Sequence, residues 1–169
     1  MNKNLPYVKL LLASSDQDKM LDNAQKISYN LCTSEFPILN ILDYKYSPKK
    51  AIEELGVDLE LMNQLIDDFV IQIVKESTTF NEFLEELQDL QTYTKNLDYT
   101  ILRELAHKNL GVARNLRIED SEKLLEIIMK ENNLEYILKA VECLLSRVIL
   151  LRPEQAYKTI RLIQVKSSF

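Results

Sequence analysis

The chain has 169 residues, of which 46% are hydrophobic and 28% are charged, and its net charge is −5. This size and balance are typical of one globular domain, with or without an extension. The acidic balance and the lack of a long basic block argue against a nucleic-acid partner. No apolar run approaches the ~20 residues that a membrane span requires, so we expect no membrane insertion.

Cysteine usage suggests a reduced protein. Cys32 and Cys143 are far apart, with no C-x-x-C pair and no clustered histidines. Disulfide frameworks and metal sites depend on such spacings. The apolar run near the N-terminus is too short for a secretory signal. We therefore expect a cytoplasmic protein without a metal site.

The fold class follows from what is scarce. The chain contains only two glycines and four prolines, and it lacks the Asn-Gly, Asp-Gly and Gly-Gly pairs that favour hairpins. Its apolar residues recur at helical spacing. These features predict an all-α protein, with an up-and-down four-helix bundle over 46–169 that includes a C-terminal helix. Residues 1–45 form an N-terminal extension whose structure is left open.

In the first half of the chain, helix signals occur in a clear order. Segment 7–13 can be a strand or the start of a helix, and 16–31 looks helical. Ser47 and the following proline predict a short helix that stops at Gly56. Asp58 then predicts the cap of a long amphipathic helix over 58–77.

In the second half, Thr79 and Glu82 have the spacing of a capping box, which predicts a separate helix over 79–96. Asp98 is expected to cap the next helix, which runs to about Leu116. Another helix is expected over 120–131. Asn132 and Glu135 repeat the cap spacing ahead of a helix over 134–151, and Pro153 is expected to begin the last helix.

The only histidine, His107, lies in the helix that Asp98 is expected to cap. At ~100° per residue, its position is almost opposite the apolar stripe. The predicted core stripe comprises Ile101, Leu105, Val112 and Leu116, with Leu102 and Ala113 just beyond. Arg103, Gly111 and Arg114 lie within about 40° of the histidine, and Leu110 and Glu104 lie about 60° to either side.

Gly111 is the feature that makes this histidine unusual. Glycine inside a helix costs ~1 kcal/mol relative to alanine, and nothing nearby in the sequence requires a kink. The angle argues against a histidine that is satisfied in or at the edge of the core. An ordinary surface histidine stays open, but it would not explain the glycine. We therefore expect a partner to approach His107 closely.

An exposed imidazole is largely neutral at pH 7, so it can act as a nucleophile toward phosphorus. Arg103 and Arg114 could hold a phosphoryl group through charge-assisted hydrogen bonds. The chain has no Walker loop and no other nucleotide fingerprint. We expect the partner to supply the metal ion and the in-line geometry.

The stretch "AHKNLGVA", with Ala106, His107, Gly111 and Ala113, resembles the motif of histidine-containing phosphotransfer (HPt) domains of bacterial phosphorelays. Residues 51–70 are similar to the opening helices of that family, and the resemblance covers roughly 46–152. It implies a four-helix bundle in which His107 is the phosphoacceptor and Gly111 gives clearance to a partner. That partner would be a response-regulator receiver domain, a hybrid histidine kinase, or both. The resemblance implies no cofactor in this chain, because Mg²⁺ is expected in the receiver.

The chain departs from the family motif beside the histidine. Leu110 stands where the motif has a lysine, and Asn109 stands where it is usually apolar. The distance from Phe69 to His107 is also longer than the family pattern. We therefore expect Arg103 and Arg114, with a smaller part for Lys108, to neutralise the phosphate. Gly111, Leu110 and Glu104 are expected to contact the partner.

Two other functions stay open at this point. The bundle could dock a receiver or kinase domain without efficient transfer, a reading that an exposed Leu110 would favour. It could also be a purely structural helical adaptor, with its function in 1–45 or in the C-terminal helix.

Overall fold

The structure is a computed structural model of the chain, described here over residues 6–167. All regular elements in this range are helical, which confirms the prediction of an all-α protein. They are α1 (Pro6–Leu12), α2 (Gln17–Ser34), the 3₁₀ turn η1 (Pro37–Leu39), α3 (Lys49–Leu55), α4 (Leu59–Leu90), α5 (Thr100–Leu116), α6 (Glu119–Lys130), α7 (Leu134–Leu151) and α8 (Pro153–Ser167).

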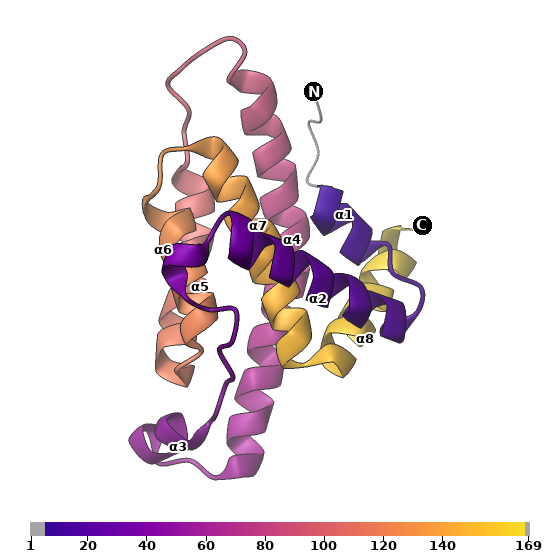
Figure 1. Cartoon of the computed structure of the whole chain (residues 1–169), viewed down its shortest axis with the longest axis vertical. Helices are drawn as coiled ribbons and strands as arrows, with labels where there is room; N and C mark the ends of the chain where they lie inside the picture. Colours follow the sequence, from indigo (N-terminus) through magenta and orange to yellow (C-terminus); the bar gives the residue numbers. More distant parts are fainter. Residues whose placement is uncertain (1–5, 168–169) are drawn as a thin grey trace.

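Helices α4, α5, α6 and α7 form a bundle. Each packs against the next in the chain, and α7 packs back against α4. The chain follows these four helices in alternating directions (Figure 1). Short connections between α5, α6 and α7 favour this antiparallel arrangement of neighbours.

Helix α7 is the centre of the molecule. It contacts α2, α4, α6 and α8, and thirteen of its eighteen residues are buried. A helix that is apolar nearly all round must be covered on every side. Helices α1, α2 and α8 provide the cover that the bundle alone does not (Figure 1). Side chains from 6–45, whose structure the sequence left open, join the same core, including Val8, Met20 and Phe36.

Several expected helix ends are confirmed. Asp58 Oδ1 accepts a hydrogen bond from the Leu61 amide (2.8 Å) at the start of α4. Gly56 ends α3 with a positive φ of 66°, a conformation that glycine adopts without strain. Pro153 begins α8. At α3, Ser47 Oγ accepts from the Lys49 amide (3.4 Å), so this helix begins slightly later than expected.

The expected helix start at Thr79 is wrong, because α4 continues through it to Leu90. The continuous helix keeps Phe80, Leu84 and Leu87 in the core. The hydroxyls just before this point are accommodated inside the helix, since Ser77 Oγ donates to the Val74 carbonyl (2.6 Å). Burial of the apolar face therefore outweighs the local cap signal.

The cap expected at Asn132 is displaced by one residue. Asn133 Oδ1 accepts from the Tyr136 amide (3.1 Å) and caps α7. Asn132 instead accepts a hydrogen bond from Arg103 through its side-chain oxygen (2.7 Å). The competing contact with another helix decides which asparagine is the cap.

Candidate functional site

His107 lies in the middle of α5, and its side chain is exposed, as expected. Within residues 6–167 no hydrogen bond or ion pair involves its imidazole. No protein partner within the described residues therefore fixes the orientation of the ring. The position suits a group that must react with something outside the chain.

Gly111 has no structural explanation on this helix. A Cβ atom built at Gly111 would meet nothing within 4 Å, and its backbone is ordinary helix. The other glycine differs, because Gly56 has the positive φ that a helix end requires. Neither packing nor backbone conformation demands glycine at 111, although it weakens the helix by ~1 kcal/mol. The glycine therefore keeps the surface bare beside His107.

The core-facing side of α5 differs from the predicted stripe. The buried residues are Leu102, Ala106, Asn109, Leu110, Ala113 and Leu116, while Ile101 and Val112 are exposed by 46% and 42%. The buried arc is thus rotated by roughly 80° from its predicted centre. The reason is that α5 packs between α4 and α6 and must bury sides facing both. His107 stays outside this arc.

The expectation that Leu110 forms an exposed contact for a partner is wrong, because its side chain is fully buried. Val112, which follows Gly111 in sequence and points about 100° away from it around the helix, is exposed instead. Glu104 is exposed, as a docking contact requires. The position that holds lysine in the HPt motif is therefore a core position of this helix.

Arg103 is turned toward the end of α6. Its guanidinium donates to the carbonyls of Met129 and Glu131 (2.9 Å to the latter) and to Asn132 Oδ1 (2.7 Å). It also lies over the ring of Tyr99, with 5.0 Å from Cζ to the centroid. The guanidinium thus donates to carbonyl groups that the end of α6 leaves without helical partners.

The other two predicted cations are also paired. Arg114 contacts Glu126 (2.9 Å) and Glu122 (3.4 Å) on α6, and its side chain is 48% exposed. Lys108 Nζ bonds the carboxylate of Glu76 on α4. A phosphoryl group on His107 would have to compete with these carboxylates for the cations.

Glu76 is a member of the site region that the sequence did not indicate. Its side chain is 9% exposed, and it accepts hydrogen bonds from Lys108, Asn109 and Gln72. Asn109 also donates to the Leu105 carbonyl (2.8 Å). The only available signal was that Asn109 interrupts an apolar position, which shows that a buried polar partner must exist.

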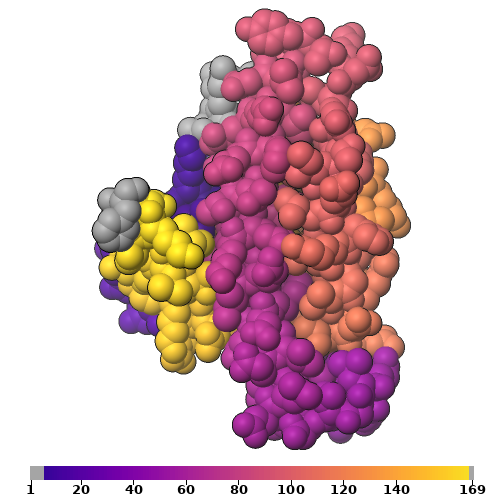
Figure 2. All heavy atoms as spheres, turned by 180° about the vertical axis from the view of Figure 1, so that it is seen from behind, coloured from indigo at the N-terminus to yellow at the C-terminus, as the bar shows by residue number. Residues whose placement is uncertain are grey.

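A groove runs between α4 and α5 on the side of α5 that carries Val112. Its volume is about 410 Å³, and it is lined mainly by Leu55, Leu65, Phe69, Val112, Asn115 and Leu116. On the face shown in Figure 2, α4 lies beside α5, with α3 at one end. Asn115, which lines the groove, lies one helical turn after Gly111 on the same side of α5, so this edge of the groove is next to the bare surface.

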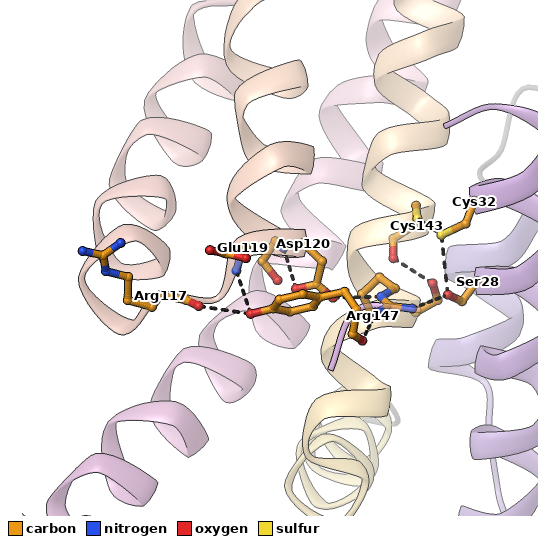
Figure 3. Close-up of polar contacts among 10 residues, drawn as sticks. Ser28, Cys32, Arg117, Glu119, Asp120, Cys143 and Arg147 are labelled. Carbon is orange, nitrogen blue, oxygen red and sulfur yellow. Dashed lines mark hydrogen bonds and ion pairs between the residues drawn. The ribbon is translucent and has the colours of Figure 1, made fainter. Parts of the chain in front are cut away.

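A second polar cluster joins α2, α6, α7 and the loop before α3 (Figure 3). Arg147 Nε donates to Asp120 Oδ2 (2.8 Å), while its other nitrogens donate to Ser28 Oγ (3.1 Å) and the Tyr44 carbonyl (3.2 Å). Tyr44 in turn donates to the Arg117 carbonyl (3.1 Å) and accepts from the Glu119 amide (3.2 Å). Burial raises the pKa of the Tyr44 hydroxyl to about 12, so it stays protonated and able to donate.

This cluster fixes the turn between α5 and α6. Tyr46 adds a hydrogen bond from its hydroxyl to the Leu116 carbonyl (2.7 Å), the last residue of α5. A cavity of about 320 Å³ lies beside Tyr44, Tyr46 and Arg147. Sequence analysis missed the cluster because Arg147 is 27 residues from Asp120 and 119 from Ser28.

Comparisons with protein-family models, curated proteins and solved structures found no match for this chain. Within the described range, no group of three or more His, Cys, Asp or Glu side chains is placed to hold a metal ion. No helix of that range is long and apolar enough to cross a membrane.

Proposed function

We propose that this chain is a phosphoryl carrier that accepts a phosphoryl group on His107 from the aspartyl phosphate of a receiver domain. One observation carries the proposal: an exposed histidine in mid-helix adjoins a glycine that neither packing nor backbone conformation requires. The sequence resemblance to HPt domains and the antiparallel bundle of α4 to α7 also support it.

In the proposed step, an unprotonated imidazole nitrogen of His107 attacks the phosphorus atom of the aspartyl phosphate. The N–P bond forms as the bond between phosphorus and the aspartate oxygen breaks, which restores the carboxylate. Return of the phosphoryl group to a second receiver reverses the step. Mg²⁺ in the receiver would neutralise the charge on the phosphoryl oxygens during transfer.

The surface around His107 fits a protein partner better than a small molecule. The imidazole of His107 is exposed on the surface and does not lie in an enclosed pocket of the described residues. The apolar groove on α5 offers Val112, Leu65 and Phe69 to a side chain or helix of a partner protein. Gly111 lies between His107 and this groove around the helix, so a receiver that contacted both would pass over Gly111. Any side chain at 111 would then stand between the two proteins.

The contacts of the three cations favour a second candidate, a docking module without efficient transfer. Arg103, Arg114 and Lys108 each bind acceptors within the chain, and Leu110 replaces the motif lysine in the core. Such a protein would bind the same receiver through the same groove. It would not take up its phosphoryl group.

The test is transfer from receiver domains that have been phosphorylated with a radiolabelled small-molecule phosphodonor. Wild-type protein should acquire label that is lost in acid and retained in base, as phosphohistidine requires. His107→Gln should acquire none and should change the free energy of unfolding by no more than about 0.5 kcal/mol, because the side chain is exposed. Binding of a receiver without labelling would identify the docking module. Label retained by His107→Gln would contradict both candidates for this residue.

A further inference from the structure

The two cysteines, which the proposed function does not use, lie against each other in the core. Cys32 on α2 and Cys143 on α7 are 111 residues apart in sequence, and their sulfur atoms are 3.8 Å apart. Figure 3 shows the sulfurs facing each other across the contact between the two helices. Both thiols are free, with 3% of Cys32 and none of Cys143 exposed.

The surroundings of the pair are polar, although the position is buried. Ser28 Oγ lies 3.8 Å from Cys32 Sγ and accepts a hydrogen bond from Arg147 (3.1 Å). An inert pair of core cysteines would be expected among apolar side chains only. Here Ser28 is the single side chain between Cys32 and the guanidinium of Arg147. Arg147 also lines the cavity of about 320 Å³ beside Tyr44.

These contacts affect the two thiols differently. The pKa of Cys32 is lowered to about 7, first by the hydrogen bond with Cys143 and then by Ser28 and the positive charge of Arg147, while burial opposes the shift. The pKa of Cys143 is raised by its hydrogen bond with Cys32 and by burial. The thiolate is the reactive form of cysteine. Cys32 is also the partner that contacts Ser28 and that has a small exposed surface, which favours Cys32 as the nucleophile of the pair.

We propose that Cys32 and Cys143 are a redox-active dithiol that a small hydroperoxide converts into a reversible intramolecular disulfide. In the first step the Cys32 sulfur attacks one peroxide oxygen. The S–O bond forms, the O–O bond breaks, and the leaving hydroxide takes a proton to become water. In the second step Cys143 attacks the sulfur of the Cys32 sulfenic acid, and its proton leaves with the hydroxyl as water. The dithiol loses two electrons, and the hydroperoxide gains two.

The cysteine pair is separate from the His107 surface. The test of disulfide formation and the test of phosphoryl transfer can therefore succeed or fail independently. It belongs to α2 and α7, whereas His107 belongs to α5. The disulfide would join α2 to α7, which are also linked in this region by the hydrogen bond from Arg147 to Ser28. A thiol reductant would reverse the linkage by thiol–disulfide exchange.

The experiment uses the full-length, folded, fully reduced protein and hydrogen peroxide as the oxidant. The expected product is a monomer that has lost two hydrogen atoms and both free thiols, and that yields one linked Cys32–Cys143 peptide on digestion. Its thermal unfolding midpoint should rise, because the link restricts an unfolded loop of more than a hundred residues. Dithiothreitol should restore both thiols and the original midpoint.

Two variants test the order of the steps. Cys143→Ser should stop at a sulfenic acid on Cys32 that dimedone traps, and Cys32→Ser should give neither product. Retention of both thiols in native wild-type protein, links only between chains, or sulfinic acid without a link would each overturn the proposal. The wild-type measurement decides the linkage even if a variant fails to fold.

Discussion

Arg147 and Asp120 form an ion pair that is buried on both sides, with 2.8 Å between Nε and Oδ2 and only 8% of each side chain exposed. The pair fixes the start of α6 to the central helix α7. A second acceptor, the Tyr44 carbonyl, ties the loop before α3 to the same guanidinium. Removal of either charge would leave the other buried without compensation.

We predict that Arg147→Met lowers the free energy of unfolding by about 3–5 kcal/mol, since it leaves the Asp120 carboxylate unpaired. The double variant with Asp120→Asn should recover part of that loss. Urea denaturation measures both. Lys26→Met is the matched control, because its pair with Asp22 is exposed and should contribute no more than about 0.5 kcal/mol. Equal losses for Arg147→Met and the control would contradict the prediction.

The two glycines should respond in opposite directions to alanine. Gly111→Ala should stabilise the protein by up to ~1 kcal/mol, because a Cβ there meets open space and helix propensity improves. Gly56→Ala should destabilise it by roughly 1–2 kcal/mol, because its φ of 66° is strained for other residues. Denaturant unfolding gives both values. Gly111→Gln should slow transfer from a receiver, and a wild-type rate would show that clearance is not the reason for the glycine.

The roles of the cations are tested by comparing variants. If Arg103 and Arg114 leave their present partners to bind phosphoryl oxygens, Arg103→Gln with Arg114→Gln should reduce the rate of transfer about tenfold or more. Lys108→Gln should have a smaller effect, since it lies about 100° from His107 around the helix. Arg161→Gln on α8 controls for net charge. Equal rates for all three variants would mean that the partner alone neutralises the phosphate.

Restoration of the motif lysine should fail, because position 110 is in the core. Leu110→Lys should cost more than about 3 kcal/mol near neutral pH, whereas Leu110→Met should cost less than about 1.5 kcal/mol. Burial lowers the folded-state pKa of a lysine below its unfolded value. The difference in the free energy of unfolding between the two variants should therefore narrow as the pH rises toward about 10.4, the ordinary pKa of lysine. A gap that does not depend on pH would show that the lysine reaches solvent.

Glu142 on α7 gives a pH prediction of the opposite sign. Its side chain is 1% exposed, and burial raises its pKa, although the Tyr7 amide (3.1 Å) and Lys139 oppose the shift. Because the folded state favours the protonated form, stability falls as the pH rises through the folded-state pKa. Glu142→Gln should therefore be more stable than wild type near pH 7. The difference in stability between Glu142→Gln and wild type should shrink when the pH falls below 4.5, the ordinary pKa of glutamate. Unfolding curves recorded near pH 7 and below pH 4.5 measure this change.

Helix ends that depend on contacts within a few residues could be predicted from the sequence. Asp58, Gly56 and Pro153 act on backbone groups a few residues away, so their sequence spacing determines the helix ends. The exposure of His107 also followed from sequence, because the apolar residues of α5 are concentrated away from it. The role of Gly111 beside His107 stays a prediction, because the open space at this glycine does not by itself show a partner.

Only the tertiary structure decided where polar and apolar groups of different helices meet. Leu110 is buried because α5 packs against both α4 and α6. Thr79 lies inside α4 because the continuous helix places Phe80 and Leu84 in the core. Glu76 meets Lys108, and Cys32 meets Cys143, across gaps of 32 and 111 residues. Helical periodicity defines one helix face at a time, whereas these contacts depend on the rotation of each helix against its neighbours.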